Sequence, residues 1–229
     1  MGHGLSSVPD GCTHLILDFD GVLADSEPLF RRSWNAALEE VGHRISEEDY
    51  WLHWSSLGEG LEGEIARRNL SIDSEQADRL RRRQRREYEG LCAAGEIPLA
   101  RGAHRLLQVL QSASDFPRGY AVASNTESGL VREILRLGRA PVPDLIVGGE
   151  GLRRKPAPDI FLRAAELLGV PPERALVVED SIKGIRAALA GGFPVVRVLN
   201  QQNFRHQAPA LADLQSLEQL TEMLLEGRR

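Results

Sequence analysis

The sequence predicts an α/β protein built on a doubly wound parallel sheet, with a small α-helical segment inserted near the N-terminal end. Two observations lead to this prediction. Short apolar runs alternate with amphipathic helical patterns from about residue 100 to residue 200, as expected where helical crossovers join parallel strands. Residues 28–97 interrupt this order, because helical periodicity dominates there and no convincing strand pattern occurs.

The first predicted strand, residues 15–18, is a continuous apolar run, which is typical of a strand buried on both faces of a sheet. Similar apolar runs occur at residues 120–123, 145–147, 175–178 and 195–198. The helices expected between them repeat apolar residues at three- and four-residue spacing, as at 103–110, 130–137 and 160–168. A final amphipathic helix is predicted from the spacing of Leu214, Leu217, Leu220 and Leu224.

The inserted segment begins directly after the first strand and ends near Ile97 and Pro98. The prediction is therefore a core made of residues 1–27 and 98–229, with residues 28–97 as a helical cap over the strand ends. The arginine-rich run RLRRRQRRE, residues 79–87, lies in the last cap helix. Ala77, Leu80 and Gln84 follow helical spacing, which leaves the arginines on the opposite face, so a solvated helix face is favoured over an electrostatic role.

Composition excludes several classes of protein. The chain has 229 residues, 42% of them hydrophobic, and no apolar run approaches the roughly 18 residues needed to span a bilayer. A net charge of -5 argues against broad nucleic-acid binding. Two cysteines, Cys12 and Cys92, are too few for a disulfide framework and fit a reducing compartment. Because the first residues also lack the pattern of a secretion signal, the expectation is a cytoplasmic protein, monomeric by default, that binds a small molecule.

Polar side chains follow four of the predicted strands, where ligands bind in open parallel sheets. In chain order they are Asp18 and Asp20, Ser124 and Asn125, Lys155, and Glu179 and Asp180. Each alone has a simpler interpretation as a turn, a helix cap or a solvated loop. The whole set in one order favours a catalytic site. Among the 28 basic residues only Lys155 and Lys183 are lysines, so a retained lysine is of interest, although Lys183 is interpreted as a solvated helix residue.

The stretches DFDGVLAD, ASN, KPAPD and VVEDS resemble the four ordered motifs of the haloacid dehalogenase-like hydrolase superfamily, over the whole chain from about Leu15 onward. The cap placed after the first motif, together with EDSIKGIRAALAGG, is similar to the phosphatase and β-phosphoglucomutase branch. The resemblance implies a Rossmann-like core, Mg²⁺ as cofactor and a small phosphorylated metabolite as substrate.

The resemblance also implies roles for the acidic residues. Asp18 is the expected nucleophile that forms an aspartyl-phosphate, and Asp20 is the general acid that later activates water. A carboxylate attacks a phosphate dianion only if cations offset their repulsion. Mg²⁺ is therefore expected on Asp18, the backbone carbonyl of Asp20 and Asp180, with Glu179 as a further ligand or a support.

The phosphoryl oxygens are expected to bind the Ser124 hydroxyl and the Lys155 ammonium group, with Asn125 as a further phosphate-binding or structural residue. Asp25 and Ser26 link the core to the cap. They have two open interpretations, as hinge or substrate residues or as the cap of the following helix.

Other branches fit less well. Asp20 disfavours dehalogenation, because a departing halide needs no proton, and the absence of lysine from residues 28–97 argues against phosphonate cleavage. A mutase must bind a second phosphate, which the acidic residues of the 54–68 segment, Glu59, Glu62 and Glu64, suit poorly. The prediction is a Mg²⁺-dependent phosphatase for a small phosphomonoester such as a phosphosugar. A β-phosphoglucomutase-like mutase and a catalytically idle binding protein are the alternatives.

Overall fold

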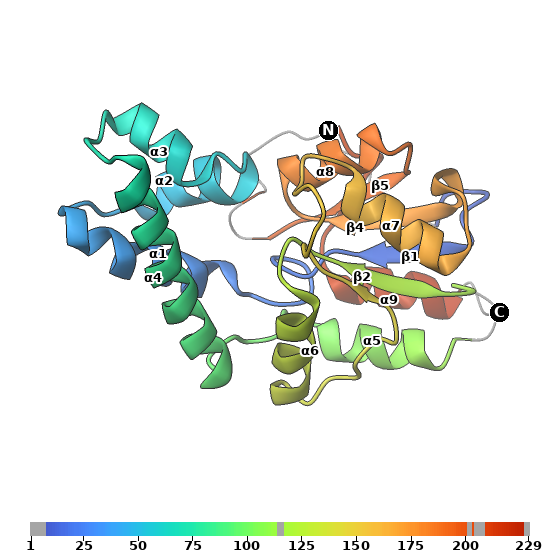
Figure 1. Ribbon diagram of the computed structural model, residues 1–229. Helices are drawn as coiled ribbons and strands as arrows, with labels where there is room; N and C mark the ends of the chain where they lie inside the picture. Colours follow the sequence, from blue (N-terminus) through green and yellow to red (C-terminus); the bar gives the residue numbers. More distant parts are fainter. Residues whose placement is uncertain (1–7, 114–116, 201–202, 204–208, 227–229) are drawn as a thin grey trace.

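A computed structural model of the chain describes residues 8–113, 117–200, 203 and 209–226. In this part of the chain the core is a six-stranded sheet with the order β3-β2-β1-β4-β5-β6, and every pair is parallel (Figure 1). The strands are β1 (His14–Leu17), β2 (Tyr120–Ala123), β3 (Ile146–Val147), β4 (Ala175–Glu179), β5 (Val195–Val198) and β6 (Asp213–Leu214). The strand order reverses at β1, as in a doubly wound fold. The predicted fold class is confirmed.

Helices cover both faces of the sheet, and the alternation of side chains along β1 shows how. Leu15 and Leu17 pack into one hydrophobic cluster, whereas Ile16 between them packs into a second cluster. The first cluster includes α5 (Ala103–Gln111), α6 (Ser128–Leu137) and α9 (Leu217–Glu226). The second includes α7 (Asp159–Leu168) and α8 (Ile182–Ala190). A short 3₁₀ turn, η3 (Pro172–Arg174), precedes β4.

The prediction for the C-terminal segment was wrong at its start. Leu214 belongs to β6, where it pairs with Val198, and α9 begins only at Leu217. Asp213 is fixed beside β5 by two hydrogen bonds of 2.7 Å from the Arg197 guanidinium. A strand of two residues has no periodicity to detect, and the spacing of Leu214 matches the helix that follows.

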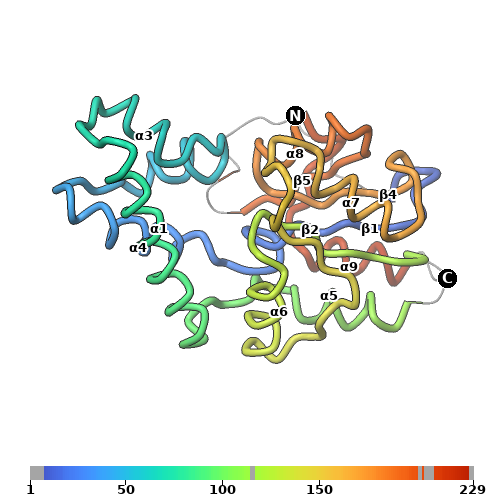
Figure 2. The backbone as a smooth tube through the Cα atoms, viewed as in Figure 1, coloured from blue at the N-terminus to red at the C-terminus, as the bar shows by residue number. Residues whose placement is uncertain are grey.

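Residues 27–93 form a helical lobe beside the sheet (Figure 2). Its elements are α1 (Glu27–Leu38), η1 (Glu39–Val41), α2 (Glu47–Asp49), the π-helical turn η2 (Tyr50–Ser56), α3 (Gly60–Arg68) and α4 (Ser74–Ala93). A third hydrophobic cluster, which includes Trp34, Tyr50, Trp54 and Leu80, comes from this lobe alone. The lobe therefore has a core of its own.

The two segments that join this lobe to the sheet run side by side. The backbone N–H of Asp25 donates to the Pro98 carbonyl at 2.9 Å, and that of Ala100 donates to the Leu23 carbonyl at 2.9 Å. Ala24 and Leu99 form an isolated antiparallel bridge between them. This double connection supports the predicted division at residues 28–97, which we propose as the cap.

Helix α4 belongs to both parts. Ala77 and Leu80 lie in the cap cluster, whereas Tyr88 and Cys92 pack into the cluster under the sheet. The arginines of this helix are mostly paired with nearby acids, as Arg79 is with Glu75 at 3.1 Å. The arginine run therefore forms a mostly solvated helix face, as predicted. Two of its residues, Arg81 and Arg85, also line the cleft described below.

Replacing Leu80 by alanine tests the packing of the cap. Leu80 is fully buried, so Leu80→Ala is expected to lower the free energy of unfolding by about 2–5 kcal/mol. Arg82→Ala, on the exposed face of the same helix, is expected to change it by less than about 0.5 kcal/mol. Urea denaturation measures both values, and equal effects would contradict a cap core built around Leu80.

Candidate active site

The carboxyl ends of the strands and the inner surface of the cap enclose a cleft of about 990 Å³. The predicted site residues that line it are Asp18, Asp20, Ser124, Asn125, Lys155 and Asp180. Glu179 is fully buried beneath them at the end of β4. The structure thus brings together side chains that lie up to 162 positions apart, at the edge of the sheet where the sequence placed them.

The ammonium group of Lys155 lies at the floor of this cleft. Its Nζ donates to Asp18 Oδ1 at 2.7 Å, to Glu179 Oε1 at 3.0 Å and to the Ala123 carbonyl at 3.2 Å. Burial favours the neutral amine, but the two carboxylates outweigh it and raise the pKa of Lys155. The group is therefore a permanent positive charge.

Asn125 acts on the loop that carries Lys155. Its side-chain oxygen accepts a hydrogen bond of 3.0 Å from the Lys155 backbone N–H. This contact corresponds to the structural interpretation of Asn125, while its contribution to phosphate binding stays a prediction.

Three carboxylates gather around Lys155. Oxygens of Asp18, Glu179 and Asp180 lie within 4.8 Å of one another, and all three residues are buried. Burial and the charge of Glu179 raise the pKa values of Asp18 and Asp180 well above the usual range. One ammonium group does not balance three carboxylates. The donor set fits a hard divalent cation such as Mg²⁺, which prefers carboxylate oxygens.

Glu179 differs from its two neighbours, because donors occupy both of its oxygens. Oε1 accepts from Lys155, and Oε2 accepts from the backbone N–H groups of Asp180 at 2.7 Å and Ser181 at 2.6 Å. Burial opposes ionisation, but Lys155 and these hydrogen bonds hold the pKa of Glu179 below its usual range. Of the two predicted roles, support of the site fits this geometry better than direct ligation.

The carboxylate of Asp20 is held away from this cluster by three hydroxyl groups. Ser26 Oγ donates to Oδ1 at 2.6 Å, and Ser124 Oγ and Thr126 Oγ1 each donate to Oδ2 at 2.8 Å. Ser26 makes no side-chain cap bond to α1, so the helix-cap interpretation does not apply to it. Thr126 was not among the predicted site residues, because the sequence does not show which hydroxyl group of a loop points inward.

Two further features hold Asp180 in place. Gly21 has a φ of +80°, and a Cβ atom there would lie 2.2 Å from Asp180 Oδ2, so only glycine fits. On the other side, Asn200 Nδ2 donates to Asp180 Oδ2 at 3.0 Å and Asn203 Nδ2 donates to the Asp180 carbonyl at 2.9 Å. Neither asparagine is predictable from the sequence, because both follow β5 in a segment without a recognisable pattern.

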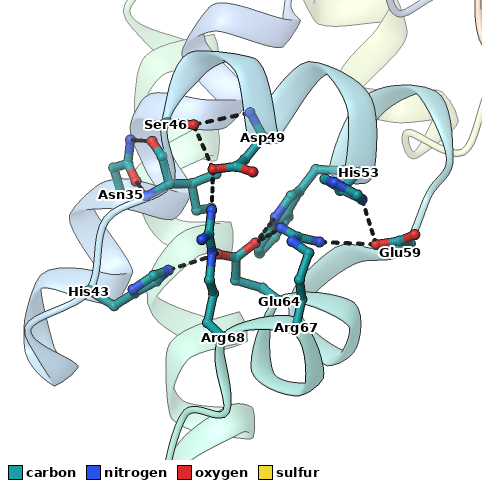
Figure 3. A network of polar contacts seen from close by, with 11 residues as sticks. Asn35, His43, Ser46, Asp49, His53, Glu59, Glu64, Arg67 and Arg68 are labelled. Atoms are coloured by element: carbon teal, nitrogen blue, oxygen red, sulfur yellow. Dashed lines mark hydrogen bonds and ion pairs between the residues drawn. The ribbon is translucent and has the colours of Figure 1, made fainter.

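One of the acidic residues of the 54–68 segment points away from the cleft, so it has no bearing on a second phosphate. Glu64 is buried inside the cap, where it accepts hydrogen bonds of 2.9 Å from Trp54 Nε1 and from His43 (Figure 3). Arg67 also donates to it. Glu64 therefore orients Trp54, whose ring lines the cleft, and does not face a substrate.

A parallel sheet with a buried aspartate and lysine at its strand ends, beneath a helical cap, defines a class of α/β enzyme suited to anionic substrates. Residues 12–192 match the haloacid dehalogenase-like hydrolase family, and the chain belongs to that family. The predicted family is thus confirmed, and the enzyme is a hydrolase.

Similar proteins agree with this assignment. The chain is 30% identical to hexitol phosphatase A of Escherichia coli over 92% of its own length and 94% of the relative's. It is 29% identical to a β-phosphoglucomutase of Mycobacterium bovis, over 89% and 87% of the two chains. A crystal structure of CbbY from Rhodobacter sphaeroides in complex with phosphate superposes with a TM-score of 0.73, at 28% identity over 91% and 96% of the two chains.

None of the helices in the described part of the chain combines the length and the apolar character that crossing a membrane requires.

Cation binding is testable by its effect on stability. Mg²⁺ at about 100 times its Kd is expected to add about 2.7 kcal/mol of stability, which corresponds to roughly 5–10 °C in Tm for a chain of this size. Asp180→Asn is expected to remove most of the shift, whereas Asp144→Asn, exposed at the opposite end of β3, keeps it. Thermal denaturation with and without Mg²⁺ measures this. Equal shifts in the parent and Asp180→Asn would exclude Asp180 as a ligand.

Proposed function

We propose that the chain is a Mg²⁺-dependent phosphoric monoester hydrolase that acts on a small phosphorylated sugar or sugar-like metabolite through a phosphorylated Asp18. The observation that carries this proposal is the contact of 2.7 Å between Asp18 and Lys155, inside a buried acidic cluster at the floor of a capped cleft. The similarity to a hexitol phosphatase over most of both chains supports a phosphosugar as substrate.

In the proposed reaction each of these side chains has a separate role. An oxygen of Asp18 attacks phosphorus, the bond from phosphorus to the ester oxygen breaks, and Asp20 gives its proton to the departing alcohol. Asp20 then takes a proton from water, which attacks the phosphorylated Asp18 and releases phosphate. Lys155 stabilises the charge on the phosphoryl oxygens throughout. Bound Mg²⁺ would neutralise further negative charge in the same place.

A mutase is the second candidate, since it would use the same core residues. It must hold a second phosphate with cations from the cap. The two cap arginines that line the cleft are already paired, Arg81 with Asp78 at 2.7 Å and Arg85 with Glu127 at 2.5 Å. Hydrolysis is therefore favoured. An idle binding protein is disfavoured, because the site retains all its charged residues.

Asp18→Asn tests the nucleophile. The amide is a poor nucleophile, so release of phosphate from para-nitrophenyl phosphate in the presence of Mg²⁺ is expected to fall by roughly 10³-fold or more. Asp144→Asn serves as the matched control and is expected to retain activity. A colorimetric phosphate assay measures both. An active Asp18→Asn variant would remove Asp18 from the mechanism, and an inactive parent would overturn the proposed hydrolase.

The two candidate reactions give different products. With β-glucose 1-phosphate, a hydrolase releases inorganic phosphate and glucose, whereas a mutase accumulates glucose 6-phosphate without phosphate release. We expect phosphate release, because the cap arginines at the cleft are paired. A coupled glucose 6-phosphate dehydrogenase assay run beside a phosphate assay distinguishes the outcomes, and isomerisation without phosphate release would establish the mutase.

A further inference from the structure

Two polar groups in the cleft lack partners within the described residues. The Tyr88 hydroxyl is buried and makes no hydrogen bond there, although the residue lines the cleft. Lys183 also lines the cleft and forms no ion pair or side-chain hydrogen bond in the described part of the chain. A buried polar group normally has a partner, and a lysine that lines a cleft can reach a ligand there, so both groups are candidates for contact with a ligand. Lys183 lies in a helix, as predicted, but it is only half-exposed, because its stem packs against Gly58.

A third polar group, the buried carboxyl of Glu27 at the start of α1, lines the same cleft. Burial raises the pKa of Glu27, while Lys183 and the Tyr50 hydroxyl, which donates to its Oε2, act in the opposite direction. Burial raises the pKa of the Tyr88 hydroxyl, and the charges of Asp20, Cys92 and Glu27 act in the same direction. Phe30 follows Glu27 by one helical turn on α1 and its ring lies 4.9 Å from the Tyr88 ring, while Lys183 comes from α8, and all of them line the same cleft.

Lys183 is held in place by the cap. A Cβ atom at Gly58 would lie 2.9 Å from Lys183 Cδ, so the lysine stem runs directly against the Gly58 backbone, which has a φ of +76°. Lys183 belongs to α8 of the core and Gly58 to the cap loop before α3. The ammonium group is thus positioned where the two parts meet.

Aromatic rings form the wall beside these groups. Trp34 and Trp54 have ring centroids 4.9 Å apart, Phe30 and Tyr88 likewise 4.9 Å, and all four line the cleft. Apolar walls with a few convergent polar groups are typical of small-molecule sites. Such a surface suits the C–H groups of a sugar or polyol, while the polar groups suit its hydroxyls.

We propose that Glu27, Tyr88 and Lys183 form a hydroxyl-binding subsite for the alcohol part of the phosphate ester, so that the substrate is the phosphate of a neutral polyhydroxylated alcohol. The proposal rests on the phosphatase function above. A sugar hydroxyl both donates and accepts hydrogen bonds, which matches a carboxylate, an ammonium and a phenol placed together. The charges of Lys183 and Glu27 oppose each other, so the subsite has no excess positive charge for a second phosphate or a carboxylate.

Selectivity for polyol phosphates over esters without hydroxyls follows from the free-energy cost of leaving Lys183 and Tyr88 unpaired. An ester without hydroxyls would enclose Lys183 and Tyr88 in the cleft without partners, whereas a polyol phosphate would satisfy both. The selectivity of the enzyme, measured as the ratio of kcat/KM for the two kinds of ester, should therefore depend on these side chains.

The experiment compares kcat/KM for sorbitol 6-phosphate with that for phenyl phosphate, with Mg²⁺ present. Tyr88→Phe and Lys183→Met are each expected to lower the ratio by about 10-fold, the usual effect of losing one hydrogen bond to a substrate hydroxyl or one charged contact. The matched controls are Tyr120→Phe in β2 and Arg186→Met on the exposed side of α8. Both are expected to keep the parent ratio.

Folding is checked separately. Tyr88→Phe removes a buried hydroxyl without a partner, so its Tm is expected to equal or exceed that of the parent, and a lower ratio then reflects binding. A ratio within twofold of the parent in both variants would overturn the subsite. So would a parent that turns over phenyl phosphate but not sorbitol 6-phosphate, or one that prefers phosphoglycolate or a bisphosphate. A parent inactive on every ester would overturn the hydrolase proposal itself.

Discussion

The buried ammonium group of Lys155 holds together side chains from three parts of the sheet. It contacts Asp18 after β1 and Glu179 at the end of β4, while its own loop follows β3. Without this charge Asp18 and Glu179 would remain buried with no positive charge beside them, which is strongly unfavourable. Asn125 fixes the loop from the side of β2. A single positive charge thus fixes Asp18 and Glu179 relative to each other.

The position of Asp18 depends in turn on the burial of β1. Leu15, Ile16 and Leu17 are fully buried between helices on both faces, so the strand has no freedom to shift. The site built at its end is unfavourable by itself, since burial and mutual repulsion raise the pKa values of Asp18 and Asp180. The apolar strand provides the stability that the acidic cluster removes, and a bound cation would supply the charge that the cluster lacks.

Much of the fold and of the core side of the site was predictable from the sequence. The carboxyl ends of parallel strands lie at one edge of the sheet, and polar residues follow several of these strands in the sequence. The remaining features depend on contacts without a sequence pattern. Thr126 and Asn200 act through loop conformations, and β6 is too short to show periodicity. Glu64 was misread, and the contact of Lys183 with Gly58 was not predicted, for a related reason: the spacing of a residue along the chain does not show which neighbouring segment it contacts.

The core side and the cap side of the cleft differ in the groups that they present. The core side carries the groups that we propose act on the phosphate, whereas the cap side carries aromatic walls and Glu27. Lys183 belongs to the core yet touches the cap at Gly58, and Tyr88 lies on α4, which packs into both hydrophobic clusters. A hydroxyl that bridges Lys183 and Glu27 would join the two parts of the enzyme directly. Recognition of the alcohol and the position of the cap over the strand ends would then be stabilised by the same contacts, so a substrate with the right hydroxyls would hold the cap against the core.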